Sequence, residues 1–344
     1  LSLPPFLCAG TRISSDNSAV NQLKYLYVLL ARRISELTLN QPAMANCLIS
    51  VGANAGNRAQ TLATVRRSMS RWNDISSLVM SAAIETQPAG GPAGQPPFLN
   101  AAIQLETDLS PEQLLKKLLA LETSLGRTRH QIWDQRTLDL DLLIYDGLIS
   151  DSEDLILPHP RMILRRFVLE PVCELAPAIH HPQTGWSMQE HLDHLQTSGF
   201  YIQIAGPPCL ARQHALARLA ACDDTVVISR PAGEQTAPDE VLRFWQDTLL
   251  NATRPGDAMV ITDFCMREVL LQDAEQLGLI QKLEQVMLPP RLLVLILEKT
   301  ANKDVRDFVN RLMPDKIVSP WLALPADNPD QIVRELQAAM IAAF

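Results

Sequence analysis

Two aspartates separated by one leucine are candidate metal ligands, in the run Thr137-Leu138-Asp139-Leu140-Asp141-Leu142. Side chains of a strand alternate between its two faces, so in a strand Asp139 and Asp141 share one face and the leucines the other. Adjacent carboxylates repel each other, and a bound cation removes that repulsion. Oxygen ligands suit Mg²⁺, which binds one or two carboxylates together with substrate phosphates. The alternative is an amphipathic strand with a solvated acidic face, and the pair alone does not decide between the two.

Basic residues flank this acidic pair, although the whole chain carries a net charge of -8. They are Arg127, Arg129 and Arg136 before it, and His159, Arg161, Arg165 and Arg166 after it. The planar fork of arginine donates bidentate hydrogen bonds to phosphate. Phosphoryl-type transfer depends mostly on positioning and on charge stabilisation, which Mg²⁺ and convergent arginines supply. The neighbourhood therefore favours a metal-assisted phosphoryl-type transfer over a solvated strand.

The elements around the pair alternate between strand and helix patterns. Strands are predicted over 46–51, 77–86, 98–106 and 137–145, and helices over 58–72, over 111–125 and over 188–195. Ser110 has the position of an N-cap, Pro111 follows at the first helical position, and Gly126 comes just past the end. The order strand-helix-strand-strand-helix-strand predicts a ferredoxin-like α+β fold. The Gly/Pro-rich loop over 87–97 is long enough to indicate a functional loop.

Six short motifs occur in the order of a known family. They are Gly52-Ala53-Asn54, the run from Gln95 to Ala102, Leu121-Glu122, Gly126-Arg127-Thr128-Arg129, the run from Arg136 to Asp141, and the run from Leu157 to Met162. Together they resemble 6-hydroxymethyl-7,8-dihydropterin pyrophosphokinase, and the resemblance covers roughly 46–195. It implies an ATP-dependent diphosphotransferase of folate biosynthesis, which moves the β,γ-pyrophosphoryl group of ATP onto the pterin hydroxymethyl oxygen and releases AMP.

The same resemblance implies a role for each matching residue. The catalytic set is Arg127, Arg136, Asp139 and Asp141, and Asp139 and Asp141 hold two Mg²⁺ ions. The ATP-binding set is Glu122, Arg129, Arg136, His159 and Arg165. The pterin-binding set is Asn54, Phe98, Asn100, Asp139 and Phe167. Two aromatic rings suit a flat heterocycle, and the asparagine amide offers both a donor and an acceptor to the pterin edge. For Phe98 and Phe167, ordinary core packing is the alternative.

The second half of the chain, 198–344, has a different rhythm from the first half, 44–197. Strand patterns over 201–205, 226–229, 258–262 and 292–297 alternate with helix patterns over 212–221, 238–250, 268–287 and 304–313. Strands separated by helices predict a parallel, doubly wound α/β sheet. The boundary is expected near Thr197-Ser198-Gly199, where the composition changes.

The start of the second half has the strand–loop–helix layout of a phosphate-binding loop. Gly206 matches the first glycine of the pattern, whereas Ala211, Arg212 and Gln213 replace its second Gly, its Lys and its hydroxyl residue. With the apolar strands that follow, this half is similar to deoxynucleoside kinases. The substitutions predict a kinase-like domain that has lost phosphoryl transfer. Its role stays open between a scaffold, a homodimer surface and a residual nucleotide binder.

Two other readings compete with an active pterin pyrophosphokinase that carries an inert second half. In a two-activity enzyme, the second half would phosphorylate (deoxy)nucleosides, and the altered run Ala211-Arg212-Gln213 argues against this. The third reading is a non-catalytic module that binds a pterin or a nucleotide, and the intact pair Asp139 and Asp141 argues against it. The intact Arg136 and His159 beside that pair argue against this third reading.

Composition narrows the partners and the compartment. The acidic net charge argues against a nucleic-acid partner, and the apolar runs are too short to span a bilayer. Six scattered cysteines indicate neither a zinc site nor a disulfide framework, so a reducing cytoplasm is expected. For residues 1–43, two interpretations stay open: an extension upstream of a start at Met44, or a genuine N-terminal arm.

Overall fold

A sheet built around the buried strand β1 (Ala45–Ala53) organises the first half. The computed structural model describes residues 44–88, 95–126, 138–152, 154–222, 225–229, 259–263, 288–298, 300, 302–313 and 319–343. In sequence order, the first half contains β1, α2 (Arg58–Met69), β2 (Ile75–Met80), β3 (Ile84–Thr86), β4 (Phe98–Thr107), α3 (Pro111–Ser124), β5 (Asp139–Tyr145), β6 (Ser150–Asp151), β7 (Ile156–Leu157), the 3-10 turn η1 (Met162–Leu164), α4 (Arg166–Leu175) and α5 (Met188–Thr197).

The strands of this sheet are antiparallel and lie in the order β2-β4-β1-β5, with β3 also paired to β4. The order of β1, α2, β2, β4, α3 and β5 along the chain is the predicted split βαβ order. Helix α3 begins as expected: Ser110 and Gln113 form a reciprocal capping box, and Gly126 after the helix has a φ of 91°.

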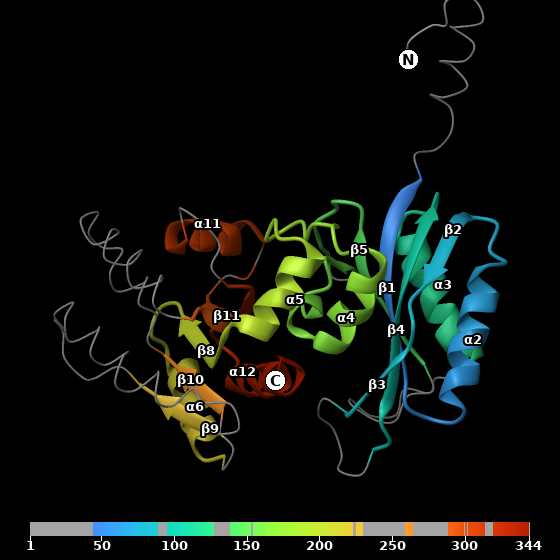
Figure 1. The fold of residues 1–344 in the computed structure, drawn as a ribbon. Coiled ribbons are helices and arrows are strands. Elements are labelled where there is room, and N and C mark those ends of the chain that lie inside the picture. The colour runs from blue at the N-terminus through green and yellow to red at the C-terminus, as the bar shows by residue number, and fades with distance from the viewer. Residues whose placement is uncertain are drawn as a thin grey trace, which may run out of the picture. The chain divides into compact units, whose positions relative to one another are not determined.

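The two faces of the sheet are covered by different helices, as Figure 1 shows. Odd-numbered residues of β1, such as Ile49 and Val51, pack with Val65 of α2 and Leu118 of α3. On the opposite face, Leu48 packs with residues of α4. Because strand side chains alternate, this arrangement sends Ser50 and Gly52 to the α4 face. That face also carries the acidic pair, because Ser50 and Gly52 are in register with Asp141 and Asp139.

The strand predicted over 77–86 is wrong in one respect, because it is two strands. Strand β2 ends at Met80, and β3 begins at Ile84. Between them, the Ser81 hydroxyl accepts a hydrogen bond from the backbone N–H of Ala102 at 2.9 Å. The backbone N–H of Ala82 donates to the Glu174 carboxylate of α4, at 3.0 and 3.1 Å. A side chain from a later helix thus replaces the partner strand at this point.

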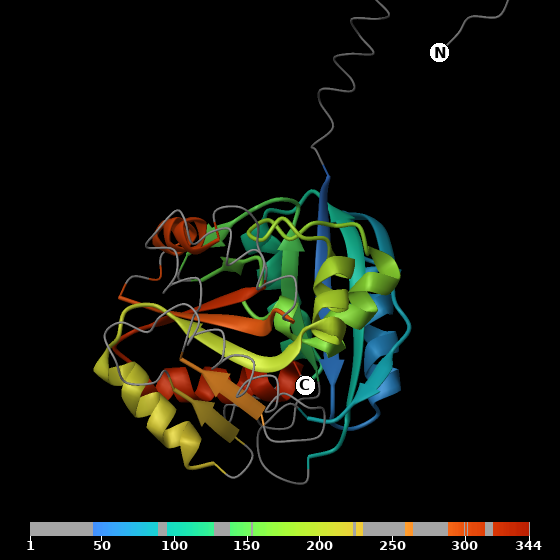
Figure 2. The same cartoon turned by 60° about the vertical axis from the view of Figure 1, so that its left-hand side comes forward.

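A parallel sheet forms the second half, as the sequence predicted. Its elements are β8 (Gly199–Ala205), α6 (Leu210–Ala220), β9 (Thr225–Ile228), β10 (Met259–Thr262), β11 (Pro290–Leu297), α11 (Asn302–Leu312), β12 (Trp321–Pro325) and α12 (Pro329–Ala343). The five strands lie in the order β12-β11-β8-β10-β9, and every pair is parallel. Helices α6 and α12 cover one face and α11 covers the other (Figure 2). The helices predicted over 238–250 and 268–287 lie outside the described residues.

Contacts within Ala45–Phe344 make it one compact unit. One hydrophobic cluster contains Leu48 of the first sheet, Leu169 of α4, Ile204 of the second sheet and Leu336 of α12. The boundary between Thr197 and Ser198 stays a prediction. Among the described helices, none combines the length and the apolar character that a membrane crossing requires.

Candidate functional site

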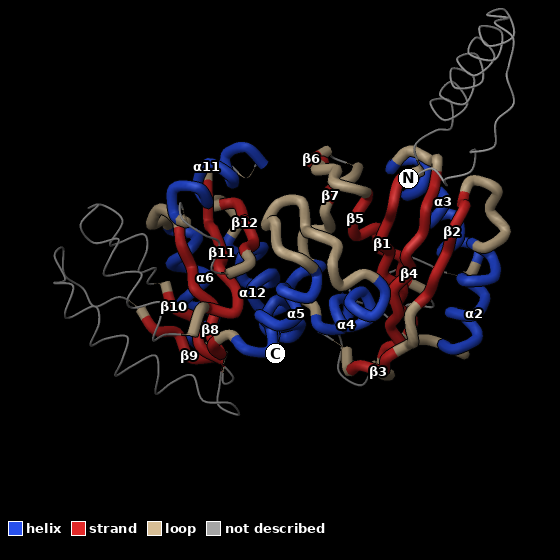
Figure 3. The backbone as a smooth tube through the Cα atoms, turned by 45° about the horizontal axis from the view of Figure 1, so that its top comes forward, coloured by secondary structure: helices blue, strands red, loops and turns tan. Residues whose placement is uncertain are grey.

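The acidic pair lies on β5, at the edge of the first sheet beside β1 (Figure 3). Asp139 and Asp141 are half-buried, whereas Leu138, Leu140 and Leu142 are buried against α2 and α3. The alternation predicted from the sequence is therefore confirmed. Two carboxylates emerge side by side on the face opposite the apolar core of that layer.

Two predicted ATP-binding residues approach this pair from the segment after β7. The Nε2 atom of His159 and the Nη1 atom of Arg165 each lie 3.9 Å from Oδ2 of Asp141. His159 is anchored to β5, because its backbone N–H donates to the Leu143 carbonyl at 2.8 Å. The fold thus brings one carboxylate of β5 together with one imidazole and one guanidinium from the segment after β7.

The imidazole of His159 is neutral at pH 7. Burial lowers the pKa of His159 to about 3, with further lowering by Arg165 and Arg161 and a smaller opposing effect of Asp139. Its Nδ1 atom accepts the backbone N–H of Arg161 at 3.2 Å. In a neutral imidazole one nitrogen accepts and the other donates, so the proton belongs on Nε2. A neutral donor therefore faces the acidic pair, where an anionic ligand oxygen could accept from it.

Glu122 supports the strand between the two aspartates. It lies on α3 and is 1% exposed, and its Oε1 atom accepts the backbone N–H of Leu140 at 2.7 Å. Among the described strands, β5 pairs only with β1, so the N–H groups on its other edge need another acceptor. The carboxyl group fixes the backbone of β5 at the residue that separates Asp139 from Asp141. Sequence reasoning missed this contact, and its predicted role as an ATP ligand stays a prediction.

Gly52 of β1 lies between two residues of the predicted pterin set, one on each neighbouring strand. It is in register with Asn100 of β4 on one side and with Asp139 of β5 on the other. A Cβ atom on Gly52 would lie 3.0 Å from Oδ1 of Asn100 and 3.8 Å from the Phe98 ring. The missing side chain thus leaves room for Asn100 and Phe98 over the middle of the sheet. The strand predicted over 46–51 ended before Gly52, whereas β1 continues to Ala53, so sequence reasoning missed this role of a glycine within a strand.

Hydrogen bonds orient both asparagines of the predicted pterin set. The Nδ2 atom of Asn100, which is 4% exposed, donates to Oγ1 of Thr86 at 2.7 Å. The Nδ2 atom of Asn54, which is 1% exposed, donates to Oε1 of Gln95 at 3.1 Å. Thr86 and Gln95 are further candidate site residues that sequence reasoning did not assign. They hold the two amides in one orientation before any ligand arrives.

The two aromatic residues of the predicted set come from different elements. Phe98 begins β4, and Phe167 lies in the first turn of α4, with the Arg165 guanidinium 5.6 Å from its ring centroid. Phe167 also packs against the hydrophobic cluster that contains Leu48 and Leu169. Both therefore belong to the α4 face of the sheet. Stacking of a pterin between them stays a prediction.

Three predicted arginines lie outside the described residues. They are Arg127, Arg129 and Arg136. The described part of the site therefore consists of three parts. They are the acidic row (Asp139 and Asp141), the segment with His159 and Arg165, and the Asn100 side (Asn54, Phe98 and Asn100). Within the described residues, no group of three or more His, Cys, Asp and Glu side chains could hold a metal. Two carboxylates still fit Mg²⁺, because this ion commonly completes its shell with phosphate oxygens and water.

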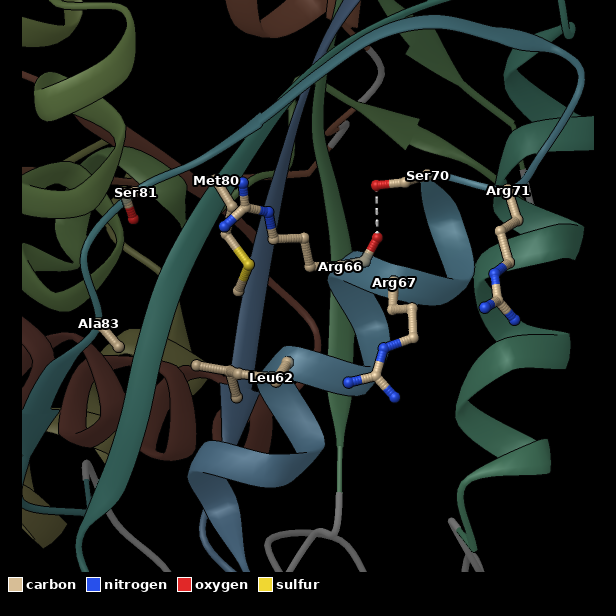
Figure 4. A pocket seen from close by; sticks show the side chains of 9 residues that line it. Leu62, Arg66, Arg67, Ser70, Arg71, Met80, Ser81 and Ala83 are labelled. Carbon is tan, nitrogen blue, oxygen red and sulfur yellow. Dashed lines mark hydrogen bonds between the residues drawn. The ribbon is translucent and has the colours of Figure 1, made fainter.

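A groove on the other face of the sheet carries arginines but does not form a focused anion site. It is lined by residues of α2 and of the segment around β2, including Arg66, Arg67, Arg71 and Met80. Figure 4 shows the three guanidinium groups pointing in different directions. Because α2 covers the face opposite the acidic pair, this groove is separate from the candidate site.

The comparisons with known proteins identify the family. The family model of 7,8-dihydro-6-hydroxymethylpterin-pyrophosphokinase matches residues 48–177. A 2-amino-4-hydroxy-6-hydroxymethyldihydropteridine pyrophosphokinase of Methylorubrum extorquens is 36% identical over 156 residues, which are 45% of this chain and 97% of that protein. The enzyme of the same name from Bacillus subtilis is 36% identical over 137 residues, which are 40% of this chain and 81% of that protein. The chain belongs to the 7,8-dihydro-6-hydroxymethylpterin-pyrophosphokinase family.

Other similar proteins are longer or less alike. The folic acid synthesis protein fol1 of Pneumocystis carinii is 37% identical over 185 residues, which are 54% of this chain and only 23% of that protein. A solved structure of wild-type Plasmodium falciparum HPPK-DHPS with pteroate has a TM-score of 0.37 at 10% identity, covering 88% of this chain and 80% of that chain.

Proposed function

We propose that this chain transfers the pyrophosphoryl group of ATP to 6-hydroxymethyl-7,8-dihydropterin in folate biosynthesis. The products are AMP and the pterin diphosphate. The observation that carries the proposal is the half-buried pair Asp139 and Asp141, with His159 and Arg165 each 3.9 Å from Asp141, in a chain of this family. Carboxylates that face cationic and donor groups across a short gap suit a metal-bound polyphosphate.

Each described residue has a part in this reaction. Asp139 and Asp141 hold Mg²⁺, two ions in the complete site, which supplies charge stabilisation to the phosphates when bound. His159 donates from Nε2 to a phosphate oxygen, and Arg165 neutralises charge beside it. Glu122 keeps β5 in place, and we retain it as a candidate contact of the nucleotide. The positions of His159 and Arg165 beside Asp141, and of Glu122 on the backbone of Leu140, support these proposed roles.

The pterin lies on the Asn100 side of the acidic row. Asn100 and Asn54 present amide groups to its edge, Phe98 and Phe167 stack on its faces, and Asp139 lies next to its hydroxymethyl group. The shared register of Asn100, Gly52 and Asp139 supports this placement. Outside the described residues, Arg127, Arg129 and Arg136 are proposed to neutralise the triphosphate as charge shifts during transfer.

An assay of AMP formation from ATP, Mg²⁺ and the hydroxymethylpterin tests this proposal. We expect AMP from the unaltered chain, and a loss of at least about 100-fold in kcat for Asp139→Asn and for Asp141→Asn, because each removes a metal ligand. Asp108→Asn, at an exposed position after β4, is the matched control and keeps its activity. The proposal fails if the folded, unaltered protein forms no AMP.

For the second half, we propose a phosphate-loop-like domain without phosphoryl transfer. Its parallel sheet, and the turn at Gly206 between β8 and α6, support the likeness. The Arg212 guanidinium donates to the carbonyl oxygens of Gly206 at 2.6 Å and of Asp263 at 2.5 Å. Because these hydrogen bonds go to main-chain oxygens, the Arg212 side chain stabilises the loop and is not directed at a phosphate. This disfavours the reading in which the second half phosphorylates nucleosides.

The full chain with ATP and deoxynucleosides, in the absence of pterin, tests the second activity. We expect no ADP above the rate without deoxynucleoside. ADP formation that depends on a deoxynucleoside would overturn this assignment of the second half. We also propose a cytoplasmic location with small molecules, and no nucleic acid, as the partners.

A further inference from the structure

An ion pair connects the second half of the chain to the segment that carries His159. The Nη2 atom of Arg161 donates to Oε1 of Glu335, which lies on α12 and is 174 positions away in the sequence. The Glu335 side chain is 14% exposed and the Arg161 side chain is 34% exposed. A pair that is shielded on one side is screened less by water and salt than an exposed pair.

Arg161 in turn sets the orientation of the His159 ring. Its backbone N–H donates to Nδ1 of His159 at 3.2 Å, and the backbone N–H of Met162 donates to the His159 carbonyl at 3.1 Å. This turn keeps Nδ1 as the acceptor and turns Nε2 toward Asp141. A shift of Arg161 would therefore move the ring that faces the acidic pair.

Glu335 also balances the charge of the neighbouring cations. Burial lowers the pKa of Arg165, Asp141 raises it, Arg161 lowers it, and Asp139 and Glu335 raise it. Glu335 thus offsets the repulsion between Arg161 and Arg165. Loss of this carboxylate would remove one of the attractions that offset the repulsion between the two guanidinium groups.

The helix that supplies Glu335 is held firmly. Ile332 and Leu336 of α12 have no exposed surface, and they belong to the same hydrophobic cluster as Met162 and Leu164 of η1. Helix α12 also contacts η1 and α4 directly. The carboxylate therefore comes from a rigid element, which suits a group that fixes the position of another side chain.

We propose that Glu335 is a positioning residue through which the second half of the chain sets the His159 side of the ATP site. The inference rests on the proposed pyrophosphokinase function. It assigns the second half a part in the first half's reaction: α12 holds Arg161, and Arg161 holds the ring that contacts a phosphate. Deleting the carboxylate weakens ATP binding more than it affects the pterin or the metal pair.

Kinetics of the full-length Glu335→Gln variant test the proposal. We expect KM for ATP to rise about 5-fold, the lower range of coupling between linked sites, with kcat and KM for the pterin within about 2-fold. The matched control is Asp330→Asn, which removes another carboxylate of α12 from an exposed ion pair with Arg218. It should leave all three constants unchanged.

Arg161→Gln and the double variant Arg161→Gln/Glu335→Gln complete a cycle. If Glu335 acts through Arg161, the double variant resembles the stronger single variant, because two groups of one pathway do not add. Additive effects, or an unchanged KM for ATP in Glu335→Gln, would overturn the proposal. A general structural role would change kcat and both KM values together and would lower the melting temperature.

Binding measurements separate this inference from the proposed function. Calorimetric titration of each variant with the α,β-methylene analogue of ATP and Mg²⁺ requires no turnover. We expect about 5-fold weaker binding for Glu335→Gln than for the unaltered chain or Asp330→Asn. If the unaltered chain formed no AMP, the proposed function would fail, and this titration would still decide whether Glu335 supports nucleotide binding. Equal affinities would refute the inference even in an active enzyme.

Discussion

The contact between Glu122 and the backbone of Leu140 predicts a clear difference between two substitutions. In Glu122→Ala, the buried N–H of Leu140 loses its acceptor, which costs about 1–3 kcal/mol. Loss of one buried methylene adds about 1 kcal/mol. The free energy of unfolding should therefore fall by about 2–4 kcal/mol, which corresponds to roughly 3–6 °C in melting temperature for a chain of this size.

The same substitution should affect catalysis more than binding of the pterin. Leu140 separates Asp139 from Asp141, so freeing its N–H lets both carboxylates shift. A displacement of about 1 Å at reacting groups costs on the order of 100-fold. We expect kcat of Glu122→Ala to fall about 10–100-fold in the AMP assay, with KM for the pterin changed by less than about 3-fold.

Glu122→Gln is the informative control. The amide keeps the shape of the side chain and one oxygen that can accept from Leu140, so we expect kcat within about 3-fold of the unaltered chain. If Glu122→Gln lost as much activity as Glu122→Ala at an unchanged melting temperature, a ligand would need the carboxylate itself. The support of β5 would then not be the reason for the residue, and the reasoning would be refuted.

Further predictions concern stability, beginning with three buried histidines around α5. They are His181, His191 and His194, with pKa values lowered by burial to about 4, 3 and 4. Below pH 6.5 the unfolded chain binds protons that the native state excludes, so stability falls as the pH falls, by up to about 1.4 kcal/mol per pH unit for each histidine. The urea midpoint of unfolding, measured at pH 7.5 and at pH 5.5, checks this, and equal midpoints would contradict it. The control variant His180→Ala, which changes an exposed histidine, should show the same difference between the two midpoints as the unaltered chain. Gly206→Ala should destabilise the second half strongly, because Gly206 has a φ of 115° and a methyl group would overlap the Ile296 carbonyl, whereas Gly147→Ala meets no atom within 4 Å. Thermal melts of both variants decide this, and equal melting temperatures would be the contrary result. Arg212→Lys should lower the free energy of unfolding by about 1–3 kcal/mol, because an ammonium group does not span the two carbonyl oxygens that the guanidinium group bridges. The same thermal melts measure this, and an unchanged stability would show that the two hydrogen bonds are dispensable.

Local patterns in the sequence were enough for much of the fold. Alternation predicted that Asp139 and Asp141 share one face, and the capping residues located the start of α3 at Pro111. Strands separated by helices predicted the parallel sheet of the second half. These features depend on residues a few positions apart, and neighbouring residues carry that information.

Elements that depend on distant partners were missed. Helix α4 (Arg166–Leu175) was not predicted over a segment rich in basic residues, and β12 and α12 at the end of the chain were not predicted either. The break between β2 and β3 also escaped prediction, because Glu174 of α4 takes the N–H of Ala82 there. The sequence around Ala82 contains no pattern that predicts a hydrogen-bond acceptor from a later helix.

The chemistry of the site divides in the same way. The sequence by itself determined which residue types are present, the acidic pair and its arginines and His159, and so the class of reaction. Only the tertiary structure decided how they are held: Glu122 on the backbone of Leu140, Gly52 between Asn100 and Asp139, and Glu335 on Arg161. Residue types and short spacings can be read directly from the sequence. These contacts cannot, because they form only when packing brings together groups that are far apart along the chain.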